Sequence, residues 1–65
     1  MKIEVEMREG KKELDMPDGF TGEDLLKELG LSPDSVLIIV NGEPVPYKEK
    51  INSNKIRIIR VVSGG

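Results

Sequence analysis

Hydrophobic and polar residues alternate strictly at the start of the chain. Between residues 2 and 8 every second side chain is apolar, which is the period of a β-strand with one buried face. Residues 11–16 continue the alternation after Glu9 and Gly10, and glycine accepts the positive φ that a tight turn requires. The pattern predicts an N-terminal β-hairpin. Its apolar positions are Ile3, Val5, Met7, Leu14 and Met16.

A helical period follows the hairpin. Thr21 stands three residues before Asp24, a spacing typical of a helix N-cap, and Gly30 stands where a left-handed C-cap belongs. Three leucines between these caps make the single apolar stripe of an amphipathic helix. They are Leu25, Leu26 and Leu29.

The second half of the chain predicts three more strands. Residues 36–40 are a continuous apolar run, mostly β-branched, that is too short for a helix. Asn41-Gly42 is a strong hairpin signal, and prolines restrict the return segment to a short edge strand. Ile51 is the apolar anchor of a polar loop, and residues 56–62 form the last strand. We expect an α+β fold with one helix packed on a mixed four- to five-stranded sheet.

One short helix does not cover both faces of this sheet. The helix is roughly 13 Å long, yet the strands at 36–40 and 56–62 place apolar side chains on both faces. Two explanations stay open for the uncovered residues: ordinary exposed side chains of a small sheet, or a docking patch for partners. The residues concerned are Leu37, Ile39, Ile59 and Val61, with Arg57 and Arg60 expected as charges at the rim.

Composition and charge exclude several kinds of function. The chain has no cysteine and no histidine, which excludes disulfides, thiolate or imidazole nucleophiles and zinc sites built from these residues. The net charge is -2 with both signs interspersed, which argues against non-specific nucleic-acid binding. No apolar run approaches the roughly 20 residues of a membrane span, and Met1 leads into alternating charge rather than a signal peptide. We therefore expect a cytoplasmic protein without membrane or nucleic-acid partners.

The C-terminal dipeptide Gly64-Gly65 is the most informative motif. Two residues without Cβ let the main chain thread a narrow channel into another protein's active site. The terminal carboxylate is ionised at neutral pH, and it can attack the α-phosphorus of ATP to give an acyl adenylate. The dipeptide alone is equally consistent with a C-terminus that has no functional role.

A second motif, combined with this end, resembles a known family. The Val-Asn-Gly-Glu-Pro-Val-Pro segment at 40–46 and the Val-Ser-Gly-Gly end at 62–65 are together similar to the ThiS/MoaD family of ubiquitin-like sulfur-carrier proteins. The resemblance extends over essentially the whole chain. The compact ThiS branch fits better, because Arg60-Val61-Val62 stands where MoaD-type chains often carry two prolines.

This resemblance implies a fold and a chemistry. It implies a single β-grasp domain at 1–62, whose first and last strands form a parallel central pair, and a flexible tail at 63–65. It further implies that Gly65 is adenylated and converted to a thiocarboxylate, while Gly64 threads the partner's channel. The sulfur would serve thiamine (thiazole), molybdopterin or tRNA thiolation pathways.

The same resemblance implies the partners. The chain would be a co-substrate and not an enzyme, with no cofactor of its own. A ubiquitin-activating-like adenylating enzyme would use ATP and Mg²⁺, and a sulfur-acceptor synthase would receive the sulfur. The free chain is expected to be a monomer.

Two other functions stay open. A ubiquitin-like protein modifier forms isopeptide bonds through the same activated Gly65, so the sequence does not separate it from a sulfur carrier. A plain interaction module would use the sheet face alone. Lysine-linked adducts would support the modifier, whereas a dispensable Gly-Gly end would support the module.

Overall fold

The N-terminal segment forms the hairpin that its alternation predicts. In the computed structural model, which describes residues 1–61, β1 (Lys2–Met7) pairs antiparallel with β2 (Gly10–Asp15). The turn consists of Arg8 and Glu9. Gly10, which follows it, has a φ of 139°, a value that side chains with a Cβ rarely adopt.

The helix begins and ends at the predicted caps. Helix α1 (Gly22–Leu29) opens with a capping box, in which the Asp24 amide donates to Thr21 Oγ1 at 3.2 Å and the Thr21 amide donates to Asp24 Oδ2 at 3.1 Å. Gly30 closes the helix in the left-handed conformation, with a φ of 70°. These local bonds satisfy backbone groups that a helix end leaves without partners.

The middle of the chain contains one element that the sequence did not predict. A single turn of 3₁₀ helix, η1 (Pro33–Ser35), stands where we expected only a break before the next strand. The strands β3 (Val36–Val40) and β4 (Glu43–Val45) then form the predicted second hairpin. Its turn residues, Asn41 and Gly42, have φ values of 54° and 80°, which agrees with the twist that tight hairpins need.

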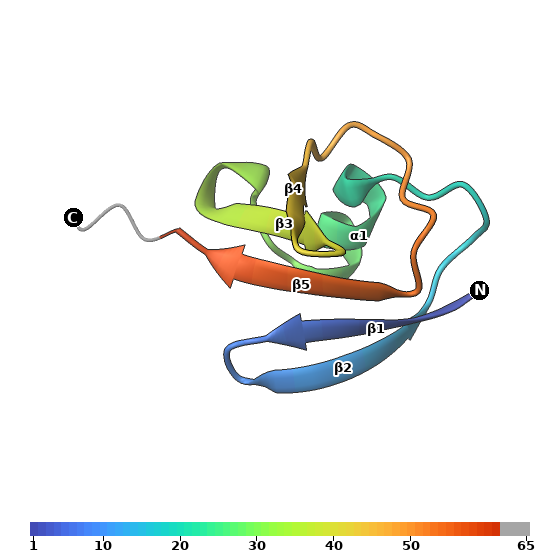
Figure 1. Cartoon of the computed structure of the whole chain (residues 1–65), viewed down its shortest axis with the longest axis horizontal. Coiled ribbons are helices and arrows are strands. Elements are labelled where there is room, and N and C mark those ends of the chain that lie inside the picture. The colour runs from blue at the N-terminus through green and yellow to red at the C-terminus, as the bar shows by residue number, and fades with distance from the viewer. Residues whose placement is uncertain (62–65) are drawn as a thin grey trace.

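The last strand joins the two hairpins into one sheet. Strand β5 (Lys55–Arg60) pairs parallel with β1 and antiparallel with β3, so the strand order is β2-β1-β5-β3-β4 (Figure 1). The predicted parallel central pair of first and last strands is confirmed. Within residues 1–61, β5 alone connects the β1–β2 hairpin to the β3–β4 hairpin.

The core lies between α1 and one face of the sheet. It combines strand residues with the helical leucines and with three residues from loops, Met16, Phe20 and Ile51. Ile51 is 2 % exposed, which confirms it as the anchor of its loop. The buried apolar residues are Ile3, Val5, Met16, Phe20, Leu25, Leu26, Val36, Ile38, Ile51, Ile56 and Ile58.

The start of α1 touches the loop that follows β4. The Glu23 amide donates to the Tyr47 carbonyl at 2.7 Å, and the Gly22 amide donates to the Glu49 carbonyl at 3.3 Å. A Cβ on Gly22 would lie 2.5 Å from Ile38 Cδ1 and 2.8 Å from Tyr47 Cα. Glycine at position 22 therefore allows the helix and the loop to approach each other closely.

We expect Gly22→Ala to destabilise the protein by about 1–3 kcal/mol, because the Tyr47 backbone cannot retreat without repacking. The direction of the stability change tests the contact, because without the contact alanine would stabilise the helix by up to about 1 kcal/mol relative to glycine. Urea unfolding measures the change. The exposed Glu28→Ala is the control and should shift stability by less than about 0.5 kcal/mol. A stabilised Gly22→Ala would contradict the close approach.

Candidate functional site

The sheet face opposite α1 carries the exposed apolar residues that the sequence predicts. Leu37 on β3 stands directly across from Ile59 on β5, and their exposed fractions are 47 % and 43 %. Ile39, two residues along β3, is half-buried. Val61 continues the alternation of β5, is 48 % exposed and donates its amide to the Ser35 carbonyl at 2.8 Å. We call Leu37, Ile39, Ile59 and Val61 the outer apolar face.

Neighbouring residues of β5 point to opposite sides of the sheet. Ile56 and Ile58 are each 3 % exposed and belong to the core, whereas Ile59 is exposed. The alternation follows from the period of two along a strand. The expected place of Ile59 on the uncovered face is confirmed.

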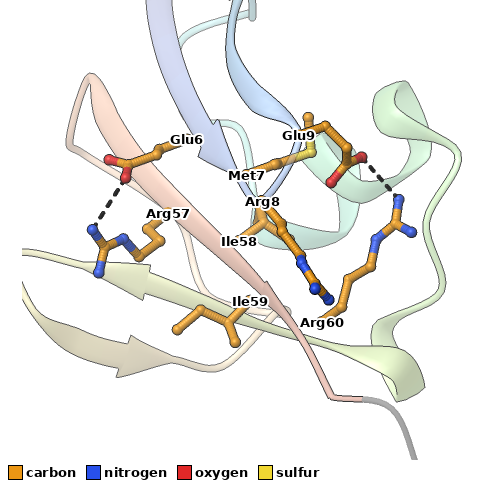
Figure 2. Close-up of a pocket in the computed structure, with 8 residues that line it drawn as sticks. All are labelled: Glu6, Met7, Arg8, Glu9, Arg57, Ile58, Ile59 and Arg60. Atoms are coloured by element: carbon orange, nitrogen blue, oxygen red, sulfur yellow. Dashed lines mark hydrogen bonds and ion pairs between the residues drawn. The ribbon is translucent and has the colours of Figure 1, made fainter.

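Arg57 lies at the rim of the outer apolar face, as expected. It stands across from Ile39 on one side and from Glu6 of β1 on the other. Its Nη2 atom is 3.1 Å from Glu6 Oε2 (Figure 2). Both side chains are about half exposed, so we expect this pair to add about 1 kcal/mol or less to stability.

Arg60 does not share this rim. It stands across from Val36, a core residue, and therefore leaves the sheet on the side of Ile58. Its Nη2 atom lies 3.3 Å from Glu9 Oε2 in the hairpin turn (Figure 2). The expectation of one rim formed by Arg57 and Arg60 is corrected here, because residues three apart on a strand face opposite sides.

The remaining candidate residues, Gly64 and Gly65, lie outside the described residues, as do the tail expected at 63–65 and the end of the domain expected at 62. The roles assigned to these two glycines stay predictions.

Neither a metal cluster nor a membrane helix is found in the described part of the chain. Residues 1–61 contain no group of three or more acidic side chains arranged to hold a metal ion. Within the same residues, no helix has both the length and the apolar character needed to cross a membrane.

Comparison with known proteins shows the family of this chain. Residues 1–62 match the family described as small archaeal modifier protein 2. The chain belongs to this family. Small archaeal modifier protein 2 of Haloferax volcanii is 32 % identical to it over 66 residues, which covers all of both chains. An uncharacterized protein of Archaeoglobus fulgidus is 31 % identical over 42 residues, which is 65 % of this chain and 63 % of that protein.

A solved structure confirms the fold of this member of the small archaeal modifier protein 2 family. A computationally designed protein based on the template of human erythrocytic ubiquitin aligns with a TM-score of 0.70, covering 98 % of this chain and 95 % of its own. The identity is 22 %, so the likeness concerns the fold alone. The expected ubiquitin-like β-grasp is thus confirmed, while the family found is a modifier family and its description does not mention ThiS.

Proposed function

We propose that this chain is a ubiquitin-like protein modifier that becomes attached to lysine side chains of other proteins through Gly65. The observation that carries the proposal is the match of residues 1–62 to the small archaeal modifier protein 2 family. The full-length similarity to the Haloferax volcanii protein of that name supports it. Of the functions that the sequence left open, these matches favour the modifier.

The proposed chemistry has two steps, both at the terminal carboxylate. A carboxylate oxygen of Gly65 first attacks the α-phosphorus of ATP, and pyrophosphate leaves, which gives an acyl adenylate. A neutral lysine amine then attacks the acyl carbon, AMP leaves, and an isopeptide bond forms. The partner enzyme supplies ATP and Mg²⁺, and we expect this ATP-dependent reaction in the cytoplasm.

We further propose that the outer apolar face docks the adenylating enzyme. Three of its four residues expose 43–48 % of their surface, and exposed apolar residues that gather in one place mark interaction sites. Arg57 supplies a charge at the rim. Two residues of the face, Ile59 and Val61, are six and four positions before Gly65 in the sequence, so one enzyme can contact both the face and the terminal carboxylate.

Peptide mass spectrometry tests the modifier function. Trypsin cleaves after Arg60, so a modified lysine would keep the remnant Val-Val-Ser-Gly-Gly. The chain is expressed with an affinity tag at its N-terminus in its native cell, and lysines that bear this remnant are sought in the purified adducts. A chain that ends at Ser63 is the control and should give none. The proposal fails if the intact chain gives none either.

A sulfur carrier is the second candidate, because it requires the same acyl adenylate. The hairpin at Asn41 and Gly42, which forms as expected, belongs to the segment that resembles the ThiS/MoaD family. In this case a sulfur nucleophile replaces AMP, and the Gly65 thiocarboxylate passes sulfur to an acceptor synthase. Intact mass spectrometry of the free chain from its native cell detects the replacement of one oxygen by sulfur.

A further inference from the structure

A groove opens where the N-terminal hairpin separates from β5 (Figure 2). The parallel pairing of β1 with β5 ends at Glu6 and Arg57. Beyond this point β1 turns towards β2, whereas β5 continues alongside β3 to Arg60. The space between them has a volume of about 600 Å³, within the range of about 300–1,000 Å³ that is typical of ligand sites. We call it the hairpin groove.

The walls of the hairpin groove are partly apolar. Met7 contributes from the end of β1, and Ile58 and Ile59 contribute from β5. Met7 is half-buried and packs against the core, Ile58 is 3 % exposed, and Ile59 is exposed. The unbranched side chain of methionine adapts its shape to different apolar partners. An apolar side chain from outside can therefore contact the accessible part of Met7.

One of the three arginines that line the hairpin groove has no ion-pair partner among residues 1–61. Glu6 is paired with Arg57 and Glu9 with Arg60, at 3.1 Å and 3.3 Å. Arg8, the third arginine of the groove, has no ion pair with any other residue in the stretch 1–61. The whole chain carries a net charge of -2, so this excess of positive charge is a local property.

The turn itself does not account for Arg8. The backbone at Arg8 does not have a positive φ, so many residue types fit this position. The turn does not require arginine, and the Arg8 side chain is exposed. Figure 2 shows it extending from the turn over the groove. A planar guanidinium in this position suits a carboxylate, which it can bind through two parallel hydrogen bonds.

We propose that the hairpin groove binds a short acidic segment of a partner protein, with a carboxylate on Arg8 and a neighbouring apolar side chain against Met7. The apolar wall favours such a segment over a small inorganic anion, which would leave that wall exposed to water. The binding requires neither ATP nor the activation of Gly65. A test of this binding therefore does not depend on the proposed modifier function.

Nuclear magnetic resonance titration of the full chain tests this proposal. The probe is a hexapeptide with blocked ends that contains one leucine between two aspartates, and the matched peptide has asparagine in place of both aspartates. We expect the acidic peptide to shift the backbone amide signals of Met7, Arg8, Glu9, Ile58 and Arg60. The asparagine peptide should bind about tenfold more weakly, the loss expected for one charge-assisted contact.

Two variants with the same loss of charge make the test specific. Arg8→Gln should weaken binding of the acidic peptide about tenfold. Lys12→Gln removes one positive charge from the same hairpin outside the groove, and should change the affinity by less than about twofold. Unchanged signals elsewhere in the chain show that each variant is folded.

Four results would overturn the proposal. They are absence of any shift up to millimolar acidic peptide, equal weakening by Arg8→Gln and Lys12→Gln, shifts centred on Leu37 and Ile39 instead of the groove, and the same shifts with inorganic phosphate alone. The last result would reveal a general anion site rather than a peptide site.

Discussion

Ile58→Asp is expected to unfold the domain, whereas Ile59→Asp should leave it folded. Ile58 is 3 % exposed in the core, and an unpaired carboxylate there costs several kcal/mol. A domain of this size has only several kcal/mol of stability in total. Ile59 is 43 % exposed on the other face, so its replacement keeps the new charge in water. Far-ultraviolet circular dichroism with thermal melting distinguishes the two neighbours.

Ile59→Asp also tests the docking role of the outer apolar face. Ile59→Asp should bind the adenylating enzyme at least about tenfold more weakly, because the new carboxylate loses its water in the complex without gaining a partner. Lys12→Asp introduces a carboxylate on β2, away from the outer apolar face, and serves as the control. If Ile59→Asp unfolds the protein, our assignment of the faces is wrong.

Loss of the terminal glycines should abolish activation without unfolding the protein. The residues that build the core lie between Ile3 and Ile58, so a chain that ends at Ser63 should lose less than about 0.5 kcal/mol of stability. Gly64→Val keeps a terminal carboxylate but adds a β-branched side chain in the partner's channel. Exchange between ATP and pyrophosphate, measured with the cognate adenylating enzyme, should fall to background for both variants.

Two controls separate activation from docking. Ser63→Ala has no branched side chain and should keep exchange near that of the intact chain. The Gly64→Val chain should still compete with the intact chain for the enzyme, because its outer apolar face is unchanged. Equal exchange by the intact chain, the chain ending at Ser63 and Gly64→Val would exclude both the modifier and the sulfur carrier.

The features that the sequence predicts well are local. The capping box of Thr21 and Asp24 and the left-handed Gly30 depend on residues only a few positions apart, and all were predicted. The alternation of β1 likewise placed Ile3 and Val5 in the core. The 3₁₀ turn at Pro33–Ser35 was missed, because three residues are too few to show a period.

The features that it did not predict depend on distant contacts. Glu6 and Arg57 are 51 positions apart, as are Glu9 and Arg60, and each pair meets only through the parallel register of β1 and β5. The close approach of Gly22 to the loop after β4 arises in the same way. The side of the sheet that Arg60 faces was an exception. The strand period alone places Arg60 on the side of Ile58, because the two residues are two positions apart.

The connection of both hairpins through β5 has a consequence for folding kinetics. Each hairpin is built from neighbouring residues, but neither can bury its apolar side chains fully until β5 enters between them. Contacts this far apart in sequence slow the search for the native state. A chain that ends before β5 has only two separate hairpins, which are marginally stable at best in water, so we expect the domain to fold in one cooperative step once β5 is present. Chains cut short before β5 would stay unfolded and open to proteolysis. Only chains that include this strand would therefore persist as folded domains.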